Sequence, residues 1–364
     1  MKRLIALLAI GLIAAPAFAA SWDMYGQVRL RAFYENADKY YSGINESDTD
    51  LSFGNAANSR IGAKVKADDK LSAVVELGLG SNENNNNAVN TRLIYACYDF
   101  GGFKLRIGQD YGPTATFFDY NQVSNTDNDL VGFGTINSGR YAQIKLMAAG
   151  FELALSRPNL AASDNVTSID VYLPRVEASY TLDIKPVKVK AFGGYQMYKR
   201  YFNAANAQVN ENLSTKDENI SAYVLGALVK ADMGAFFATA SGYYGSNTGL
   251  MGYQGTQSGL NNTATPGFYN NNLEDSTDFG FAVNAGFKVS DSLILEAGYG
   301  YAQADRDGYA KEDAAQSYYV NATVKLAKNF FIVPEISVED RMKNTSDQDQ
   351  GKKVFYGAKF QANF

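Results

Sequence analysis

The sequence contains no histidine and only one cysteine, Cys97. Without histidine, the Ser-His-Asp, Cys-His and Asp-His arrangements of many hydrolases cannot form. A histidine-bearing metal site is also impossible, and one thiol cannot build a thiolate metal site or an internal disulfide. The sequence has neither a C-x-x-C-H haem-attachment motif nor a phosphate loop ending in Gly-Lys-Ser/Thr. We therefore expect no enzyme activity, no metal and no cofactor.

Proline and long hydrophobic runs are also scarce. The chain has 7 prolines, and after residue 19 no apolar stretch approaches the roughly 20 residues that a membrane-spanning helix needs. It is rich instead in tyrosine (25), phenylalanine (22) and glycine (33). Aromatic residues favour strands, while Asn, Asp and Gly favour the turns between them. This composition predicts an all-β protein, and the absence of a Pro-rich linker or charge block predicts one domain.

The first residues have the pattern of a secretory signal peptide. Lys2 and Arg3 precede an apolar run over residues 4–15, and Ala17-Phe18-Ala19 forms a small-x-small cleavage site. A membrane anchor is the alternative, but the run is too short to span. We expect residues 1–19 to be removed and residues 20–364 to form the mature domain. Loss of Lys2 and Arg3 from 33 basic and 38 acidic residues leaves a net charge of about −7, which disfavours a nucleic-acid partner.

Alternation of apolar and polar residues recurs along the mature chain. In "MYGQVRLRAFYE" (24–35), one parity carries Met24, Val28 and Leu30, while the other carries Arg29 and Arg31. Side chains of a strand alternate between its two faces, so this pattern predicts one apolar and one wet face. Sixteen such strands are expected, near 24–35, 59–67, 71–80, 90–100, 103–110, 139–148, 151–157, 171–182, 187–199, 219–230, 235–245, 277–289, 293–303, 316–327, 330–341 and 352–364.

The connections between these strands alternate in length. Seven are short, at 68–70, 101–102, 149–150, 183–186, 231–234, 290–292 and 328–329, and the eight between them are long and polar. An even number of antiparallel strands, with short turns at one end and long loops at the other, is typical of an outer-membrane barrel. A soluble β-sandwich or an exported β-helix would not sort its connections in this way. Aromatic residues near strand ends also fit lipid interfaces.

Two prolines conflict locally with this assignment. Pro334 lies inside the predicted fifteenth strand, where a closed barrel has no free edge to tolerate a missing N–H donor. We expect a bulge or a shifted boundary at Pro334. Pro174 is expected to mark the true start of the eighth strand.

Four stretches in order along the chain resemble the general (non-specific) porins of Gram-negative bacteria, the sixteen-stranded trimeric class. They are "MYGQVRLRAFYE", "NSRIGAKVKADDKLSAVVELGLGS", "FKLRIGQDYGPT" and "YGAKFQANF". The resemblance implies an outer-membrane homotrimer in contact with lipid and lipopolysaccharide. It also implies that Phe364, with Tyr356 and Phe360 on the same parity, forms the signal read by the barrel-assembly machinery.

In these porins the third long loop folds into the lumen, and residues 111–137 occupy that place here. The alternative is that these residues form an external loop. An external loop, however, has little use for the apolar side chains of Phe117, Phe118, Val131 and Phe133. Basic side chains on one wall facing carboxylates on such a loop would create a transverse field across the pore. Candidates for the basic wall are Arg29, Arg31, Arg60, Lys64, Arg92, Arg106 and Arg140, of which Arg60, Arg92 and Arg140 match the family best; candidate loop acids are Asp119, Asp127 and Asp129.

Sixteen strands leave an interior too wide for side chains to fill, so the barrel is expected to hold a water-filled channel. The first functional hypothesis is passive diffusion of ions and small hydrophilic solutes. A substrate-selective channel of the same fold, preferring anions or sugars, is the second. A structural or adhesive barrel, with its external loops as the working part, is the third.

Overall fold

The computed structural model describes residues 20–43, 46–56, 58–81, 87–160, 166–202, 217–253, 258–260, 263–269 and 272–364. The predicted signal peptide, residues 1–19, lies outside them. No helix in these described ranges is both long and apolar enough to cross a membrane.

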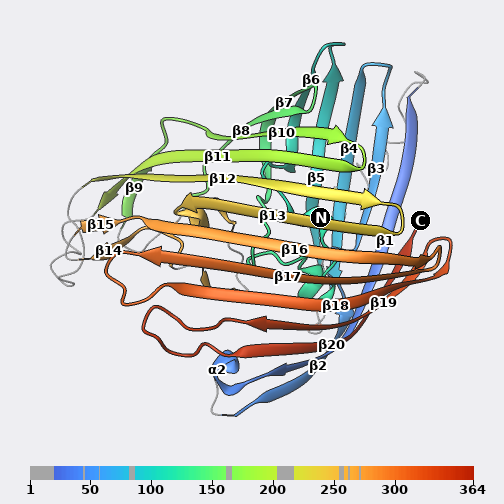
Figure 1. The fold of residues 1–364 in the computed structure, drawn as a ribbon. Coiled ribbons are helices and arrows are strands. Elements are labelled where there is room, and N and C mark those ends of the chain that lie inside the picture. The colour runs from blue at the N-terminus through green and yellow to red at the C-terminus, as the bar shows by residue number, and fades with distance from the viewer. Residues whose placement is uncertain are drawn as a thin grey trace.

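One large antiparallel sheet makes up most of the described chain (Figure 1). Its 18 segments are β1 (Ser21–Ala37), β2 (Asp48–Asn55), β3 (Arg60–Lys66), β4 (Leu71–Ser81), β5 (Asn87–Asp99), β6 (Lys104–Tyr111), β7 (Arg140–Ala148), β8 (Phe151–Ser156), β9 (Val166–Asp170), β10 (Arg175–Ile184), β11 (Val187–Phe202), β12 (Glu218–Met233), β13 (Phe236–Ser246), β16 (Ser276–Ser290), β17 (Leu293–Arg306), β18 (Asp313–Ala327), β19 (Phe330–Asp340) and β20 (Lys352–Asn363).

Two pairs of segments each form one interrupted barrel strand. β1 pairs with β2 through residues 30–37 and with β3 through residues 21–27. In the same way, β11 pairs with both β9 and β10. Counting β2/β3 and β9/β10 once each gives the sixteen strands of the predicted barrel. The short hairpin of β14 (Gly267–Tyr269) and β15 (Asn272–Glu274) and the helix α2 (Lys39–Ser42) lie outside this sheet.

The barrel closes where β1 pairs with β20. Their register runs from Gln27 opposite Asn363 to Ala37 opposite Lys353. Beyond this ladder, the Gly26 amide donates to the Phe364 carbonyl at 2.7 Å, and the Phe364 amide donates back at 3.0 Å. The Phe364 ring covers Gly26, since a Cβ there would lie 2.4 Å from it. Because the first and last strands of the sheet pair with each other, neither is left as a free edge, as a lipid-embedded sheet requires.

Alternation places apolar side chains outside and polar side chains inside. Val28, Tyr356 and Phe364 are exposed on the outer face, while Lys359 is buried on the inner face. The alternation of residues 354–364 is not strict, however, because Phe355 also points inward. It packs with Phe33, Val333 and Val123, the last of which belongs to an inner segment described below.

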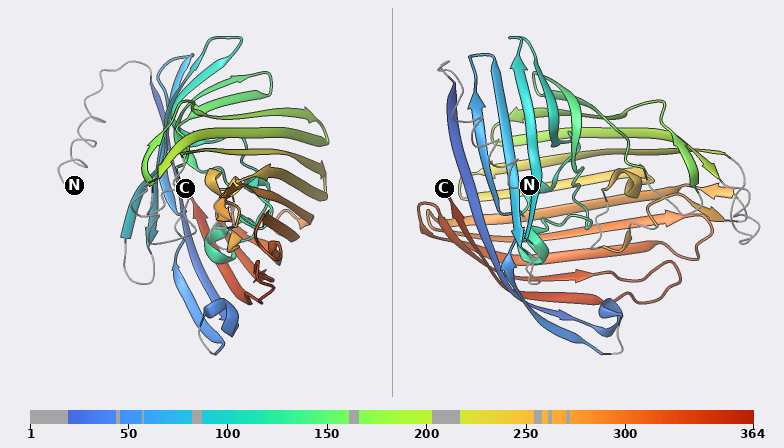
Figure 2. Two further views of the ribbon diagram at one scale, coloured as in Figure 1. Left: turned by 90° about the vertical axis from the view of Figure 1, so that its left-hand side faces the viewer. Right: turned by 180° about the vertical axis from the view of Figure 1, so that it is seen from behind.

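The seven predicted short connections are all present, and Figure 2 shows the strands as a ring around inner segments. β10 begins directly after Pro174, but the eighth barrel strand already starts with β9 at Val166, so Pro174 lies at an interruption of this strand and not at its start. The expectation for Pro334 is wrong: it lies within β19 opposite Ala358 with no bulge. The β18–β19 pairs on either side, Asn321 with Glu335 and Val324 with Ile332, keep one register, so the missing donor interrupts the ladder without shifting it.

β2 was not expected, since residues 48–55 were predicted to belong to a polar loop. Only Leu51 and Phe53 mark one apolar face in "DTDLSFGN", which is too weak a pattern to predict a strand. Pairing with β1 stabilises β2 as a strand, although its own sequence does not predict one.

Candidate functional site

Residues 112–139, the inner segment, cross the inner face of the sheet. The Tyr120 hydroxyl donates to the Ala282 carbonyl on β16 at 2.9 Å. The amides of Val123 and Ser124 both donate to the Glu335 carboxylate on β19, at 2.8 and 2.9 Å. Polar groups on the inner wall thus satisfy the irregular backbone of the segment, as burial requires.

Glycines allow the inner segment to approach the wall closely. A Cβ on Gly300 of β17 would lie 1.9 Å from the Phe133 carbonyl oxygen, and one on Gly134 would lie 2.0 Å from the Phe281 carbonyl oxygen. Gly134 also has φ +103, a left-handed conformation that favours glycine. The space beside Gly300 is therefore filled by backbone of the inner segment.

Asp127 joins the inner segment to the seam between β1 and β20. Its carboxylate lies 2.5 Å from Arg29 Nη1 and 3.1 Å from Lys359 Nζ, and it accepts from Asn58 Nδ2 at 3.0 Å. Burial alone would raise the pKa of Asp127, but the cations Lys359 and Arg29 outweigh it and hold the pKa below its ordinary value. Burial and the Asp127 charge raise the pKa of nearby Asp129.

Three arginines lie on the wall formed by β3, β5 and β7. Arg92 Nε contacts the Glu76 carboxylate at 2.7 Å, and Arg60 Nη1 lies 3.7 Å from the same group. Arg92 and Arg140 both donate to the Tyr111 hydroxyl, at 3.2 and 2.9 Å. The Glu76 carboxylate and the Tyr111 hydroxyl thus hold the three arginine side chains close together.

These groups line one cavity of about 1020 Å³ between the inner segment and the wall. Among the described residues, its basic lining is Arg29, Arg60, Arg92, Arg140 and Lys359, and its acidic lining is Glu76, Asp127 and Asp129. The structure therefore brings together four of the predicted basic residues and two of the predicted acids.

The other predicted site residues lie away from this cavity. Arg31 pairs with Glu35 at 3.2 Å, and Arg106 pairs with Asp110. Lys64 is exposed, with its ammonium 5.3 Å from the centre of the Tyr25 ring. Asp119 contacts Lys230 Nζ on β12 at 2.6 Å, so it anchors the inner segment to the opposite wall.

Glu76 and Lys359 line the cavity but were not among the predicted site residues. Lys359 has inward parity on the closing strand, and this parity could have indicated the cavity. Glu76 has the same inward parity in "LSAVVELGLG". Alternation shows which face a side chain occupies, and it does not show how far along the pore that side chain lies.

A second stretch also folds inward, although residues 246–276 were predicted to form an external loop. Leu250, Met251 and Tyr253 pack with Ile136 of the inner segment and with the wall. Leu260 packs with Phe133. The apolar residues within the polar "GSNTGLMGYQGTQSGLNN" are the signal that could have revealed this packing, because an external loop does not need them.

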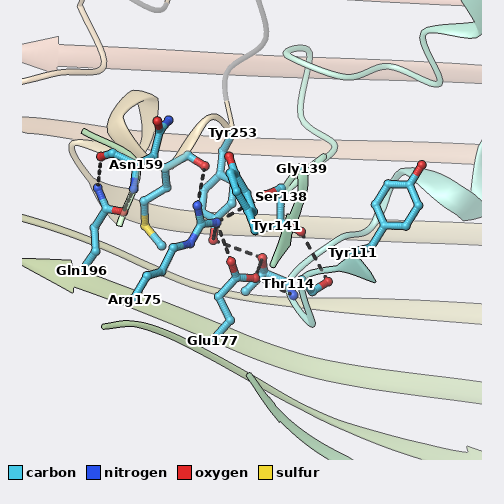
Figure 3. Close-up of polar contacts among 12 residues, drawn as sticks. Tyr111, Thr114, Ser138, Gly139, Tyr141, Asn159, Arg175, Glu177, Gln196 and Tyr253 are labelled. Carbon is cyan, nitrogen blue, oxygen red and sulfur yellow. Dashed lines mark hydrogen bonds and ion pairs between the residues drawn. The ribbon is translucent and has the colours of Figure 1, made fainter. Parts of the chain in front are cut away.

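Arg175 on β10 links both inward stretches to the wall (Figure 3). Its fully buried guanidinium contacts Glu177 at 2.5 Å and donates to the Met251 carbonyl at 3.1 Å and the Tyr253 hydroxyl at 3.2 Å. Glu177 in turn accepts from the Thr114 hydroxyl at 2.5 Å. A buried ion pair with these further hydrogen bonds fixes both stretches in place.

The predicted assembly-signal residues share the outer face of β20. Tyr356 and Phe364 are exposed and Phe360 is partly exposed. The Tyr356 ring stacks on Tyr34 of β1 with centroids 5.2 Å apart. Their role in assembly stays a prediction.

A closed sixteen-stranded barrel with a charged, partly obstructed lumen defines an outer-membrane channel. The model of the Gram-negative porin family matches residues 6–332, and the chain belongs to that family. It is thus a channel for passive diffusion across the outer membrane and not an enzyme.

Solved structures of other outer-membrane proteins share the fold. The outer-membrane channel DcaP of Acinetobacter baumannii is 16% identical, with a TM-score of 0.68 over 95% of this chain and 97% of that one. The anion-selective porin from Comamonas acidovorans is 14% identical, with a TM-score of 0.63 over 95% and 100%. OmpT of Vibrio cholerae, in its trimer form, is 14% identical, with a TM-score of 0.57 over 95% and 99%. No curated protein sequence matches the chain.

Proposed function

We propose that the cavity beside the inner segment is the channel constriction and that it favours small hydrophilic anions. Arg29, Arg60, Arg92 and Arg140 form its basic wall, while Asp127 and Asp129 are the acids of the loop. The observation that carries this proposal is the excess of five basic over three acidic side chains in the cavity lining. Ring-like arrangements of one charge in a narrow lumen select permeant ions of the opposite sign.

The arrangement of the charges strengthens this preference. Asp127 is nearly inaccessible, with a side chain only 2% exposed, and it lies between Arg29 and Lys359. Its charge is therefore offset locally, whereas Arg140, which also lines the cavity, has no ion pair with a carboxylate among the described residues. A passing anion meets net positive charge on the wall formed by β3, β5 and β7.

We also propose that the chain forms a homotrimer in contact with outer-membrane lipid and lipopolysaccharide. The wide outer band of exposed apolar side chains, including Val28, Leu225 and Ile336, supports a lipid or subunit contact. OmpT of Vibrio cholerae, which shares the fold, is described in a trimer form. Conductance steps that close in threes in planar bilayers would support a trimer.

Reversal potential across a bilayer with a KCl gradient tests the proposed selectivity. The wild-type channel should favour chloride, and Arg60→Gln with Arg92→Gln should shift the reversal potential toward potassium. Lys66→Gln is the control, because the Lys66 side chain is 60% exposed beside a turn and pairs there with Asp69. An unchanged reversal potential in the double variant would exclude these arginines from the constriction.

A further inference from the structure

Phe118 is an apolar ring exposed in a charged lumen. The residue is 57% exposed, and it lines the same cavity as Arg60, Arg92 and Arg140. An isolated exposed phenylalanine on an outer surface is ordinary, but one inside a polar channel gives every passing solute an apolar contact.

The backbone around Phe118 is held in place on both sides. It belongs to the short helix η1 (Phe117–Asp119), where Asp119 contacts Lys230 at 2.6 Å. The Asn284 side chain donates to the Asp119 carbonyl at 2.9 Å, and the next residue, Tyr120, is bound to β13 and β16. The ring is therefore presented to the cavity by a fixed segment, so little ordering is needed when a solute binds.

Arg140 provides a positive charge near this ring. Within the described part of the chain, no carboxylate lies within 4 Å of its guanidinium, which donates only to the Tyr111 hydroxyl, at 2.9 Å. A guanidinium can donate two parallel hydrogen bonds to a carboxylate, and Arg140 retains that capacity.

Tyr111 sets the spacing between the apolar and the charged group. Its ring centroid is 4.9 Å from that of Phe118, in an edge-to-face contact, and 5.3 Å from the guanidinium carbon of Arg140. Phe118 and Arg140 thus both contact the Tyr111 ring. A benzene ring that stacks on Phe118 with ordinary aromatic spacing can direct a carboxylate substituent toward Arg140.

We propose that Phe118 and Arg140 form a binding site for small arylcarboxylates inside the channel. The proposal rests on the proposed anion preference and adds to it a preference for one class of anion. The carboxylate binds Arg140, and the ring stacks on Phe118. An aliphatic anion of the same charge, such as acetate, makes only the first contact.

Block of KCl current in planar bilayers by benzoate and by acetate tests this site. Benzoate should reduce the wild-type current at roughly fivefold lower concentration than acetate, the factor expected from one aromatic contact. Phe118→Ala should abolish this difference. Phe118→Leu, which keeps most of the side-chain volume, should also reduce the difference. Arg140→Gln should weaken block by both anions.

Phe100→Ala is the matched control, because Phe100 is 52% exposed at a turn and stacks on Phe103 outside the cavity. Equal block by benzoate and acetate in the wild type, or an unchanged ratio in Phe118→Ala, overturns the site. A wild-type reversal potential that favours potassium overturns the proposed anion preference instead. The blocking ratio and the reversal potential therefore test the two proposals separately.

Discussion

At the scale of single residues, Asp127 and Asp129 show how neighbouring carboxyls can acquire opposite properties. Asp127 contacts Lys359 and Arg29, while Asp129 is partly buried beside the Asp127 charge. The pKa of Asp127 is consequently below its ordinary value and that of Asp129 above it. As pH falls, Asp129 is the first of the two to take up a proton.

This difference predicts that anion preference is pH-dependent. Protonation of Asp129 removes a negative charge from the lumen, so chloride preference should rise as pH falls through the raised pKa of Asp129, above the usual Asp range. Asp127 stays ionised in this window. The measurement is reversal potential against pH. Asp129→Asn should remove the step, and asparagine tolerates the left-handed φ of 52 at this position. The same step in the variant would assign it to another group.

Phe364 is a second residue whose role can be tested. Phe364→Ala removes the ring on Gly26 and keeps the backbone hydrogen bonds between the two residues. We expect less folded protein in the outer membrane and normal single-channel conductance from the molecules that insert. Tyr180→Ala, which removes a ring 49% exposed on β10, is the control. Equal yields of both variants would contradict a special role for Phe364.

At the scale of elements, alternation predicted the strands well and the inward segments poorly. The pattern identifies two faces for each strand, and the polar inner face marks a wet lumen. It could not show that the stretch containing Leu250 and Tyr253 packs inside, because packing depends on contacts distant in sequence. Phe33, Val333 and Phe355, which are apolar on the inner parity, indicated only that the inner segment covers the wall beside them, where Val123 packs.

Close approach between the inner segment and β17 predicts a sensitive glycine. Gly300→Ala would place a Cβ within 1.9 Å of the Phe133 carbonyl oxygen, so the segment must move. We expect a loss of about 1–3 kcal/mol in stability, as for other overpacked sites, together with altered conductance. Thermal unfolding and single-channel recording measure the two effects.

Gly242→Ala on β13 is the matched control for this substitution. A Cβ on Gly242 would meet its nearest atom at 3.5 Å, an ordinary contact. Both changes add one methyl group to a strand glycine, so they share the same effect on backbone entropy. Equal melting temperatures and conductances for the two variants would show that the inner segment does not press on Gly300.

At the scale of the whole molecule, the seam between β1 and β20 completes the sheet, and its register can be tested by crosslinking. Gly26 and Phe364 exchange both backbone hydrogen bonds, so the next pair, Gln27 and Asn363, is of the closer, non-bonded type. Gln27→Cys with Asn363→Cys, in a Cys97→Ala background, should form a disulfide and raise the temperature of unfolding.

Gln27→Cys with Gln361→Cys provides the out-of-register control. Gln361 lies opposite Arg29, two residues away from the partner of Gln27, and this diagonal spacing exceeds what a disulfide spans comfortably. Preferential crosslinking of this second pair would contradict the register. Mass spectrometry of the oxidised proteins identifies the bonds, and heating in detergent measures their effect.

The seam also determines the order in which the barrel can fold. β1 and β20 lie at opposite ends of the described sequence, so their pairing has the highest loop-closure cost in the sheet. Every hairpin between them can form earlier from neighbouring strands. Until β20 arrives, however, β1 and the growing sheet expose open edges that invite pairing with other chains. The nascent barrel is consequently most prone to aggregation just before its final strand is in place.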